Sequence, residues 1–242
     1  MRKLLKLIAV SAALGAAFPA AAAPTLLVSS DAASYSGPVL NLTGYNNGAY
    51  NFTFGPKFLP NGITFEAFPG GGGGSGLGSV IGQGGYGLGH SDGNGSLGDA
   101  ATYIGVDSAT GYAELTFATP VSSFGGYWNY YQTYDLDSGI YFYDGDTPTL
   151  SAYNANGDLI ASYDLFTMAP ISTPGGFNQF VFRGISDDTA DITTIRFGGS
   201  YIALAGTADG SLPAIPEPET YAMLLAGLGV LGLVVRRRRK QA

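Results

Sequence analysis

The sequence contains no cysteine and a single histidine, His90. Without cysteine the chain can form no disulfide and offers no thiolate to a metal ion or a substrate. One histidine excludes metal sites built from several imidazoles, and it excludes catalysis by a histidine base that reaches the nucleophile from elsewhere in the fold. Residues 89–93 read "GHSDG", the spacing of a nucleophile elbow around Ser91, but the histidine is the neighbouring residue, and adjacent side chains normally point apart. We therefore predict no serine hydrolase.

Basic residues are scarce between the two ends of the chain. Of eleven Lys and Arg residues, three lie within the first six positions and five within 236–240, so that three remain between them: Lys57, Arg183 and Arg196. Sixteen of the eighteen acids precede residue 216, which gives this middle part a formal net charge of −13. Nucleic-acid partners require a basic surface and are excluded. Such an acidic surface keeps a protein solvated and attracts cations.

Helical periodicity is absent between residues 24 and 213, and a period of two takes its place. Within residues 112–120, Ala113, Leu115 and Phe117 alternate with Glu114 and Thr116. Two further apolar runs lie at 149–154 and 159–166, and an Asn-Gly turn signal at 156–157 separates them. Short runs of this kind are separated by Gly, Asn, Asp and Pro; they occupy residues 50–55, 62–68, 149–154, 159–166, 177–184 and 191–199. They predict an all-β fold for residues 23–212, an antiparallel, jelly-roll-like β-sandwich.

Glycine is concentrated in one segment, with fifteen glycines in the twenty-nine positions 70–98. Ordering such a backbone costs more conformational entropy than that of any other composition, so we predict a Gly-rich loop within the sandwich. Residues 82–87 read "GQGGYG" and match the spacing of a dinucleotide fingerprint. The strand and the helix that must flank this fingerprint are not indicated, so we predict no nucleotide site.

The N-terminus has the three parts of a secretory signal. Arg2, Lys3 and Lys6 precede an apolar run at 7–18, and small residues follow at 20–22. This order predicts a signal peptide over residues 1–22, export by the Sec machinery across the inner membrane and no disulfide in the exported product. A retained anchor is the alternative, although the apolar run is shorter than the roughly 20 residues of a spanning helix.

The C-terminus is built from three elements in a fixed order. A Pro216-Glu217-Pro218 tripeptide comes first, fifteen uncharged residues follow at 221–235, and five cations close the sequence at 236–240. The two prolines exclude helix before the apolar segment. A fifteen-residue helix rises about 22 Å, which is shorter than the hydrocarbon core of about 30 Å, so it reaches across only with the help of snorkelling arginines and the interfacial Tyr221. We predict a short transmembrane helix whose basic cluster stays cytoplasmic and stops transfer.

This order resembles the PEP-CTERM sorting signal. The resemblance covers residues 216–242 and rests on the tripeptide, on Thr220 and Tyr221, and on the arginine cluster Arg236, Arg237, Arg238 and Arg239. It implies a Gram-negative exported protein that is a transient inner-membrane precursor and is recognised and cleaved near the tripeptide by exosortase, a transpeptidase-like membrane enzyme. It also implies association with the exopolysaccharide of an extracellular matrix or biofilm. Residues 112–204 loosely resemble the β-rich passenger domains of such proteins. A permanent anchor is the alternative.

The most distinctive stretch of the middle part is rich in aromatic residues: Tyr127, Trp128, Tyr130 and Tyr131 lie within five positions. Alternation places Trp128 and Tyr130 on one side of a strand and the other two on the opposite side. Exposed aromatic rings suit the apolar faces of sugars, whereas buried ones would be core packing. Both interpretations stay open, and the first makes a carbohydrate-binding module the alternative function.

The acids and the sequons give weaker signals. Glu66 and Glu114 are the glutamates that precede the tail, and nothing in the sequence brings an acid pair to glycosidase spacing. Asp pairs at 135/137, 144/146 and 187/188 suit solvated turns, and a structural calcium site is the alternative. Because the turn interpretation is preferred, no metal site and no cofactor is predicted. Asn94 lies in an Asn-Gly-Ser sequon with Asp92 two positions earlier and is a candidate glycosylation site. We predict an exported, non-enzymatic surface or matrix protein.

Overall fold

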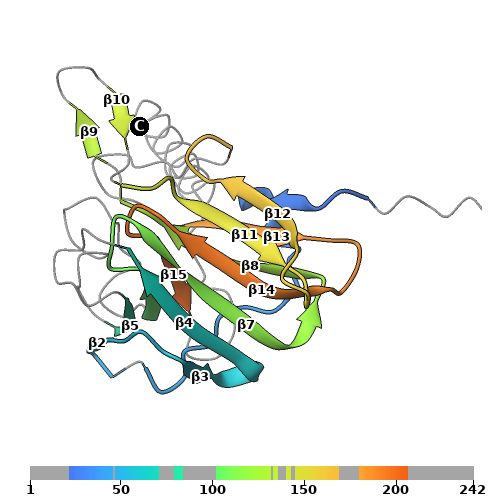
Figure 1. The fold of residues 1–242 in the computed structure, drawn as a ribbon, viewed down its shortest axis with the longest axis horizontal. Helices are drawn as coiled ribbons and strands as arrows, with labels where there is room; N and C mark the ends of the chain where they lie inside the picture. The colour runs from blue at the N-terminus through green and yellow to red at the C-terminus, as the bar shows by residue number, and fades with distance from the viewer. Residues whose placement is uncertain are drawn as a thin grey trace, which may run out of the picture.

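The computed structural model shows an all-β chain in which two antiparallel sheets pack face to face as a sandwich (Figure 1). Within the described residues, no helix combines the length and the apolarity needed to cross a membrane. The predicted signal peptide, except for its last residue, and the predicted membrane helix lie outside the described residues. The residues that the structure describes are 22–45, 47–70, 79–83, 102–131, 133–135, 140–142, 145–168 and 180–206.

The first sheet has seven strands, and its central strand comes from the end of the described chain. In spatial order they are β1 (Thr25–Leu27), β13 (Val181–Ser186), β8 (Ser123–Asn129), β15 (Ala203–Gly206), β6 (Thr102–Gly105), β5 (Val80–Gln83) and β2 (Tyr50–Phe52). All neighbours are antiparallel. Strands that are distant in the sequence therefore become neighbours in this layer.

The second sheet has six strands and contains the longest strand, β7 (Gly111–Val121). Its spatial order is β12 (Leu159–Asp164), β11 (Thr149–Tyr153), β14 (Ile192–Gly198), β7, β4 (Ile63–Pro69) and β3 (Lys57–Leu59). A separate hairpin pairs β9 (Thr133–Asp135) with β10 (Ile140–Phe142). Two short 3-10 turns occupy Ser29–Asp31 and Pro60–Gly62.

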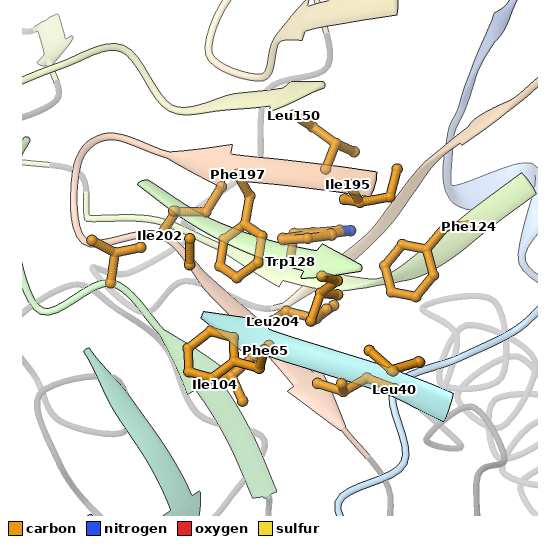
Figure 2. Packing of buried hydrophobic residues seen from close by; sticks show 14 of the residues in the cluster. Leu40, Phe65, Ile104, Phe124, Trp128, Leu150, Ile195, Phe197, Ile202 and Leu204 are labelled. Carbon is orange, nitrogen blue, oxygen red and sulfur yellow. The ribbon is translucent and has the colours of Figure 1, made fainter. Parts of the chain in front are cut away.

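The core lies between the two sheets, and the predicted alternation fills it. On β7 the apolar phase is buried, with Ala113 and Leu115 fully buried and Phe117 nearly so. Leu150 and Ala152 of β11 point into the same core. Figure 2 shows rings and branched side chains from both layers interdigitating around Trp128. The period-two prediction is thereby confirmed for these strands, and their opposite phase faces away from the core.

Two consecutive glycines in β8 allow the first sheet to pack closely on both sides. A Cβ atom on Gly125 would lie 2.6 Å from the Phe182 ring, and one on Gly126 would lie 2.5 Å from Leu204 Cδ1. Real side chains do not tolerate such distances, so a residue larger than glycine would force a neighbour to move. The "GG" before the aromatic stretch is therefore a packing requirement of β8.

The glycine-rich segment differs from the predicted loop in one place. Residues Val80–Gln83 form β5, which pairs with β2 on one side and with β6 on the other. Ile81 is fully buried in the core. Burial of its apolar side chain and pairing on both edges offset the entropy cost that glycine imposes on the neighbouring backbone. The remainder of the segment, residues 71–78 and 84–98, lies outside the described residues.

Candidate functional site

Trp128 lies at the centre of the sandwich core and is fully buried. Its Nε1 donates a hydrogen bond of 2.9 Å to the backbone oxygen of Arg183 on β13. Its ring meets Phe197 and Phe124 edge-on, with centroid separations of 5.0 and 6.5 Å. Figure 2 shows Phe197 of β14 approaching Trp128 from the other layer, and Phe124 lies on the same strand as Trp128. The polar end of the tryptophan is thus satisfied inside the protein, and its faces are covered.

The other three aromatic residues of this stretch point in different directions. Tyr130 is fully buried and packs on Phe166. Tyr127 and Tyr131 are partly buried, and they meet Phe182 and Tyr201 edge-on at 5.8 and 5.9 Å. Contrary to the glycan-contact interpretation, the four side chains do not form one exposed surface. Core packing is the interpretation that fits Trp128 and Tyr130, because strand alternation turns both toward the second sheet.

A different aromatic group lies on the outer side of the six-stranded sheet. We use the term aromatic face for Phe68, Tyr112, Tyr153 and Arg196, which come from β4, β7, β11 and β14. The Arg196 Cζ atom lies 4.3 Å from the Tyr112 ring centroid and 4.7 Å from the Tyr153 ring centroid. Phe68 stacks on Tyr112 at 5.0 Å, with 30° between the ring planes. The guanidinium and three rings thus form one continuous stack across four neighbouring strands.

An ion pair fixes the guanidinium of the aromatic face. Nε and Nη2 of Arg196 donate to Oε1 of Glu114 on the neighbouring strand, at 2.9 and 2.6 Å. The two side chains are 37% and 20% exposed. Partial burial lowers the pKa of Arg196, but the hydrogen bonds to Glu114, the charge of that carboxylate and the two tyrosines raise the pKa above its ordinary value overall. The stack therefore keeps a permanent cation held between its rings.

The register of β4 and β7 places two glutamates opposite each other. Glu66 faces Glu114 directly, and Arg196 faces Glu114 from the other side. Opposed carboxylates repel each other, and the arginine offsets this cost. Beside this row, Thr194, Thr116 and Thr64 face one another across the same three strands. Sequence reasoning missed the acid pair because only the pairing of β4 with β7 creates it.

The candidate acids that the structure describes accept hydrogen bonds from backbone nitrogens, both within a turn and from distant segments. Asp187 Oδ1 accepts from the Asp188 backbone nitrogen, Asp188 Oδ2 accepts from that of Ala22, and Asp146 Oδ2 accepts from that of Gly111. Among the described residues, no three His, Cys, Asp or Glu side chains lie close enough to hold one metal ion. The candidate glycosylation site Asn94 falls outside the part of the chain that the structure describes.

The sorting residues also lie outside the described residues, and comparison with known families addresses them directly. A family model described as the PEP-CTERM protein-sorting motif matches residues 214–239. The match spans Pro216, Glu217, Pro218, Thr220 and Tyr221, together with the arginines at 236–239. Comparison of the chain with curated proteins and with solved structures gives no match. The chain therefore carries a PEP-CTERM protein-sorting motif at its C-terminus, which marks an exported, cell-surface-associated protein that exosortase processes.

Proposed function

We propose that this chain is a non-enzymatic protein of the outer cell surface or extracellular matrix of a Gram-negative bacterium. Its jelly-roll-like sandwich is the passenger, and after sorting it associates with exopolysaccharide in the matrix or biofilm. The observation that carries this proposal is the sorting motif at residues 214–239. The strongly acidic middle part supports it as well, because a net charge far from zero keeps an exported protein solvated.

Each element of the tail has a separate physical task in this proposal. The Pro216-Glu217-Pro218 tripeptide presents a rigid, extended backbone to exosortase. The uncharged segment 221–235 holds the precursor in the inner membrane, and the arginines at 236–239 stop transfer and stay cytoplasmic. Cleavage near the tripeptide then separates the passenger from both.

Intact mass tests the sorting part of the proposal. The exported protein is purified from a host that contains exosortase and from an isogenic host that lacks it. We expect loss of the signal peptide in both hosts, and loss of the C-terminal arginines in the first host alone. With Pro216→Ala and Pro218→Ala together, the uncleaved precursor should accumulate in the membrane fraction. A wild-type protein that keeps its C-terminal arginines in the exosortase-containing host would show a plain anchor instead.

The opposed glutamates allow a test of the non-enzymatic part. Retaining glycosidases use two carboxyl groups about 5–5.5 Å apart, and opposite strand positions place Cβ atoms at about 4.5–5.5 Å. Glu114, however, is held by Arg196, and the pair lies on a sheet face. We expect no new reducing ends when the mature protein is incubated with neutral glucans, and the same result for Glu66→Gln. Release of reducing ends that Glu66→Gln abolishes would contradict the proposal.

A further inference from the structure

The aromatic face has the composition of a surface that recognises sugars. Sugar rings present apolar C–H faces and a rim of hydroxyl groups, so they stack on aromatic rings and hydrogen-bond to polar neighbours. Phe68 is 40% exposed, and Tyr112 and Tyr153 are partly exposed beside it. The Thr194–Thr116–Thr64 row and the Glu66 carboxylate supply hydroxyls and an acceptor on the same side of the sheet.

The extent of this surface indicates a chain of sugars. The stack runs from Tyr153 on β11 through Arg196 on β14 and Tyr112 on β7 to Phe68 on β4. Neighbouring strands lie about 4.8 Å apart, so three steps between strands cover about 14 Å. A polymer can lie along this line and reach both ends of the stack, whereas a monosaccharide would leave most of the line uncovered.

Charge favours a neutral polymer. Arg196 is already neutralised by Glu114, and Glu66 forms no ion pair within the described ranges. The three charged side chains of this row thus sum to one negative charge, and the middle part of the chain carries −13. Both charges repel a polysaccharide that carries carboxylates or sulfates. Hydroxyl groups of a neutral polymer can instead donate to Glu66.

The same composition argues against a protein partner. The cores of protein interfaces are depleted of glutamate, whereas Glu66 and Glu114 lie opposite each other in the middle row of this surface. In a face-to-face dimer of two copies, Glu66 and Glu114 of one copy would approach the same acidic row of the other. An extended, hydroxyl-rich polymer meets neither difficulty.

We infer that the outer face of the six-stranded sheet binds a neutral polysaccharide along the stack of Tyr153, Arg196, Tyr112 and Phe68. This inference rests on the proposed function, since the exported location brings the passenger to extracellular polysaccharide. Tyr153 and Phe68 end the stack, which leaves one ring face of each for a sugar ring, whereas Arg196 and Tyr112 lie between them and are positioning residues that hold the two end rings. Binding is reversible and breaks no bond.

Affinity electrophoresis with the mature protein from the exosortase-containing host tests the inference. The gels contain hydroxyethyl cellulose, galactomannan or arabinoxylan, and alginate serves as the acidic comparison. We expect at least one neutral polymer to retard the wild-type protein and alginate not to. Replacing both tyrosines (Tyr112→Ala with Tyr153→Ala) should weaken retardation about tenfold or more, because the Tyr153 stacking contact is lost and Phe68 loses the ring that supports it. Absence of retardation by all three neutral polymers overturns the inference, as does stronger retardation by alginate.

Two further variants separate binding from folding. Tyr112→Phe with Tyr153→Phe keeps both rings and should retain most of the affinity. Phe52→Ala removes a side chain of similar exposure, 37%, from β2 in the other sheet and should bind as the wild type does. All variants must show the wild-type melting temperature within a few degrees. Equal binding by the double alanine variant and the wild type would overturn the site. Failure of the sorting test by mass leaves this binding result unchanged, so the two proposals fail separately.

Discussion

The Trp128 stretch and the aromatic face are both rich in aromatic side chains, yet they occupy opposite environments. Trp128 is fully buried, and its indole nitrogen bonds to a backbone oxygen of β13. Tyr112 and Tyr153 lie against a partly exposed guanidinium on the outer side of the second sheet. The comparison shows that local density of aromatic residues does not identify an exposed site. The phase of each residue on its strand decides whether it faces the core or the solvent.

The two regions also differ in how they are assembled. The four aromatic residues of the Trp128 stretch lie within five positions, but the structure sends them to different surroundings. Phe68, Tyr112, Tyr153 and Arg196 are separated by at least forty positions, and sheet pairing brings them together. The aromatic face is thus assembled by the register between neighbouring strands. The core around Trp128 instead collects the side chains that point inward from each strand.

The largest contrast is expected in stability. Trp128→Ala removes a fully buried indole, leaves a cavity and loses the hydrogen bond to the Arg183 backbone oxygen, so it should cost about 3–5 kcal/mol in free energy of unfolding. Tyr112→Ala should cost less than about 1 kcal/mol, because its ring is partly exposed and makes surface contacts. Urea unfolding of both variants measures the difference. Equal costs would remove the distinction between core and surface.

Alkaline pH should destabilise the protein through Tyr35, which packs on Phe182 of β13. Burial raises the pKa of Tyr35 from 10.0 to about 12, despite hydrogen bonds with Ser123 and Gly125 that lower it. Above pH 10 the unfolded state loses this proton first, so the free energy of unfolding falls between pH 10 and pH 12. A difference of two pKa units between the folded and unfolded states lowers the free energy of unfolding by at most about 2.7 kcal/mol.

Tyr35→Phe provides the measurement for this effect. The variant cannot ionise at this position, so its stability should fall less than that of the wild type between pH 10 and pH 12. Below pH 10 the two curves should run parallel, with a constant offset from the lost hydrogen bond to Pro38. Parallel curves throughout the alkaline range would show that Tyr35 titrates alike in both states.

Added volume on β8 should be more costly than added volume on the exposed part of β7. Gly126→Ala places a methyl group against Leu204 and should destabilise the protein by about 1–3 kcal/mol. Ala118→Val adds carbon atoms at an exposed position of β7 and should stay within about 0.5 kcal/mol of the wild type. Thermal unfolding compares them, and a neutral Gly126→Ala would show that this part of the core is loosely packed.

The smallest effect is expected for the ion pair of the aromatic face. A double-mutant cycle with Arg196→Met and Glu114→Gln should give a coupling energy of about 0.5–1 kcal/mol, since both side chains are partly exposed. High salt should reduce this coupling. A coupling of several kcal/mol would assign the pair to the core of the fold, and the aromatic face would then be chiefly a stabilising device.

The sequence was sufficient to predict the sheet-forming segments that alternate clearly. The runs that include β4, β7, β11, β12 and β14 all appear as strands, because period-two burial is a local property of the chain. Strands β6 and β15 are four residues each and buried at every position, so they carry no alternation. β5 is surrounded by glycine, and its pairing on both edges, which the sequence does not show, stabilises it.

The two candidate sites differ in the same way. The sorting signal is a linear motif, so its tripeptide, uncharged segment and arginines could be recognised directly. The aromatic face depends on the register of β4, β7, β14 and β11, which is set by tertiary packing. One signal was present in the sequence: Tyr112, Glu114 and Arg196 all fall in the outward phase of predicted strands. Nothing local indicated that these strands are neighbours.

Fluorescence quenching tests the central comparison most directly, because Trp128 is the single tryptophan of the chain. Acrylamide quenching of its emission is measured in the mature protein, with and without the neutral polysaccharide that retards it, and again in guanidinium chloride. A core tryptophan predicts weak quenching in the folded protein, no further protection by the polysaccharide, and strong quenching after unfolding. Strong quenching in the folded state that the polysaccharide suppresses would place the binding surface at Trp128 and contradict the account.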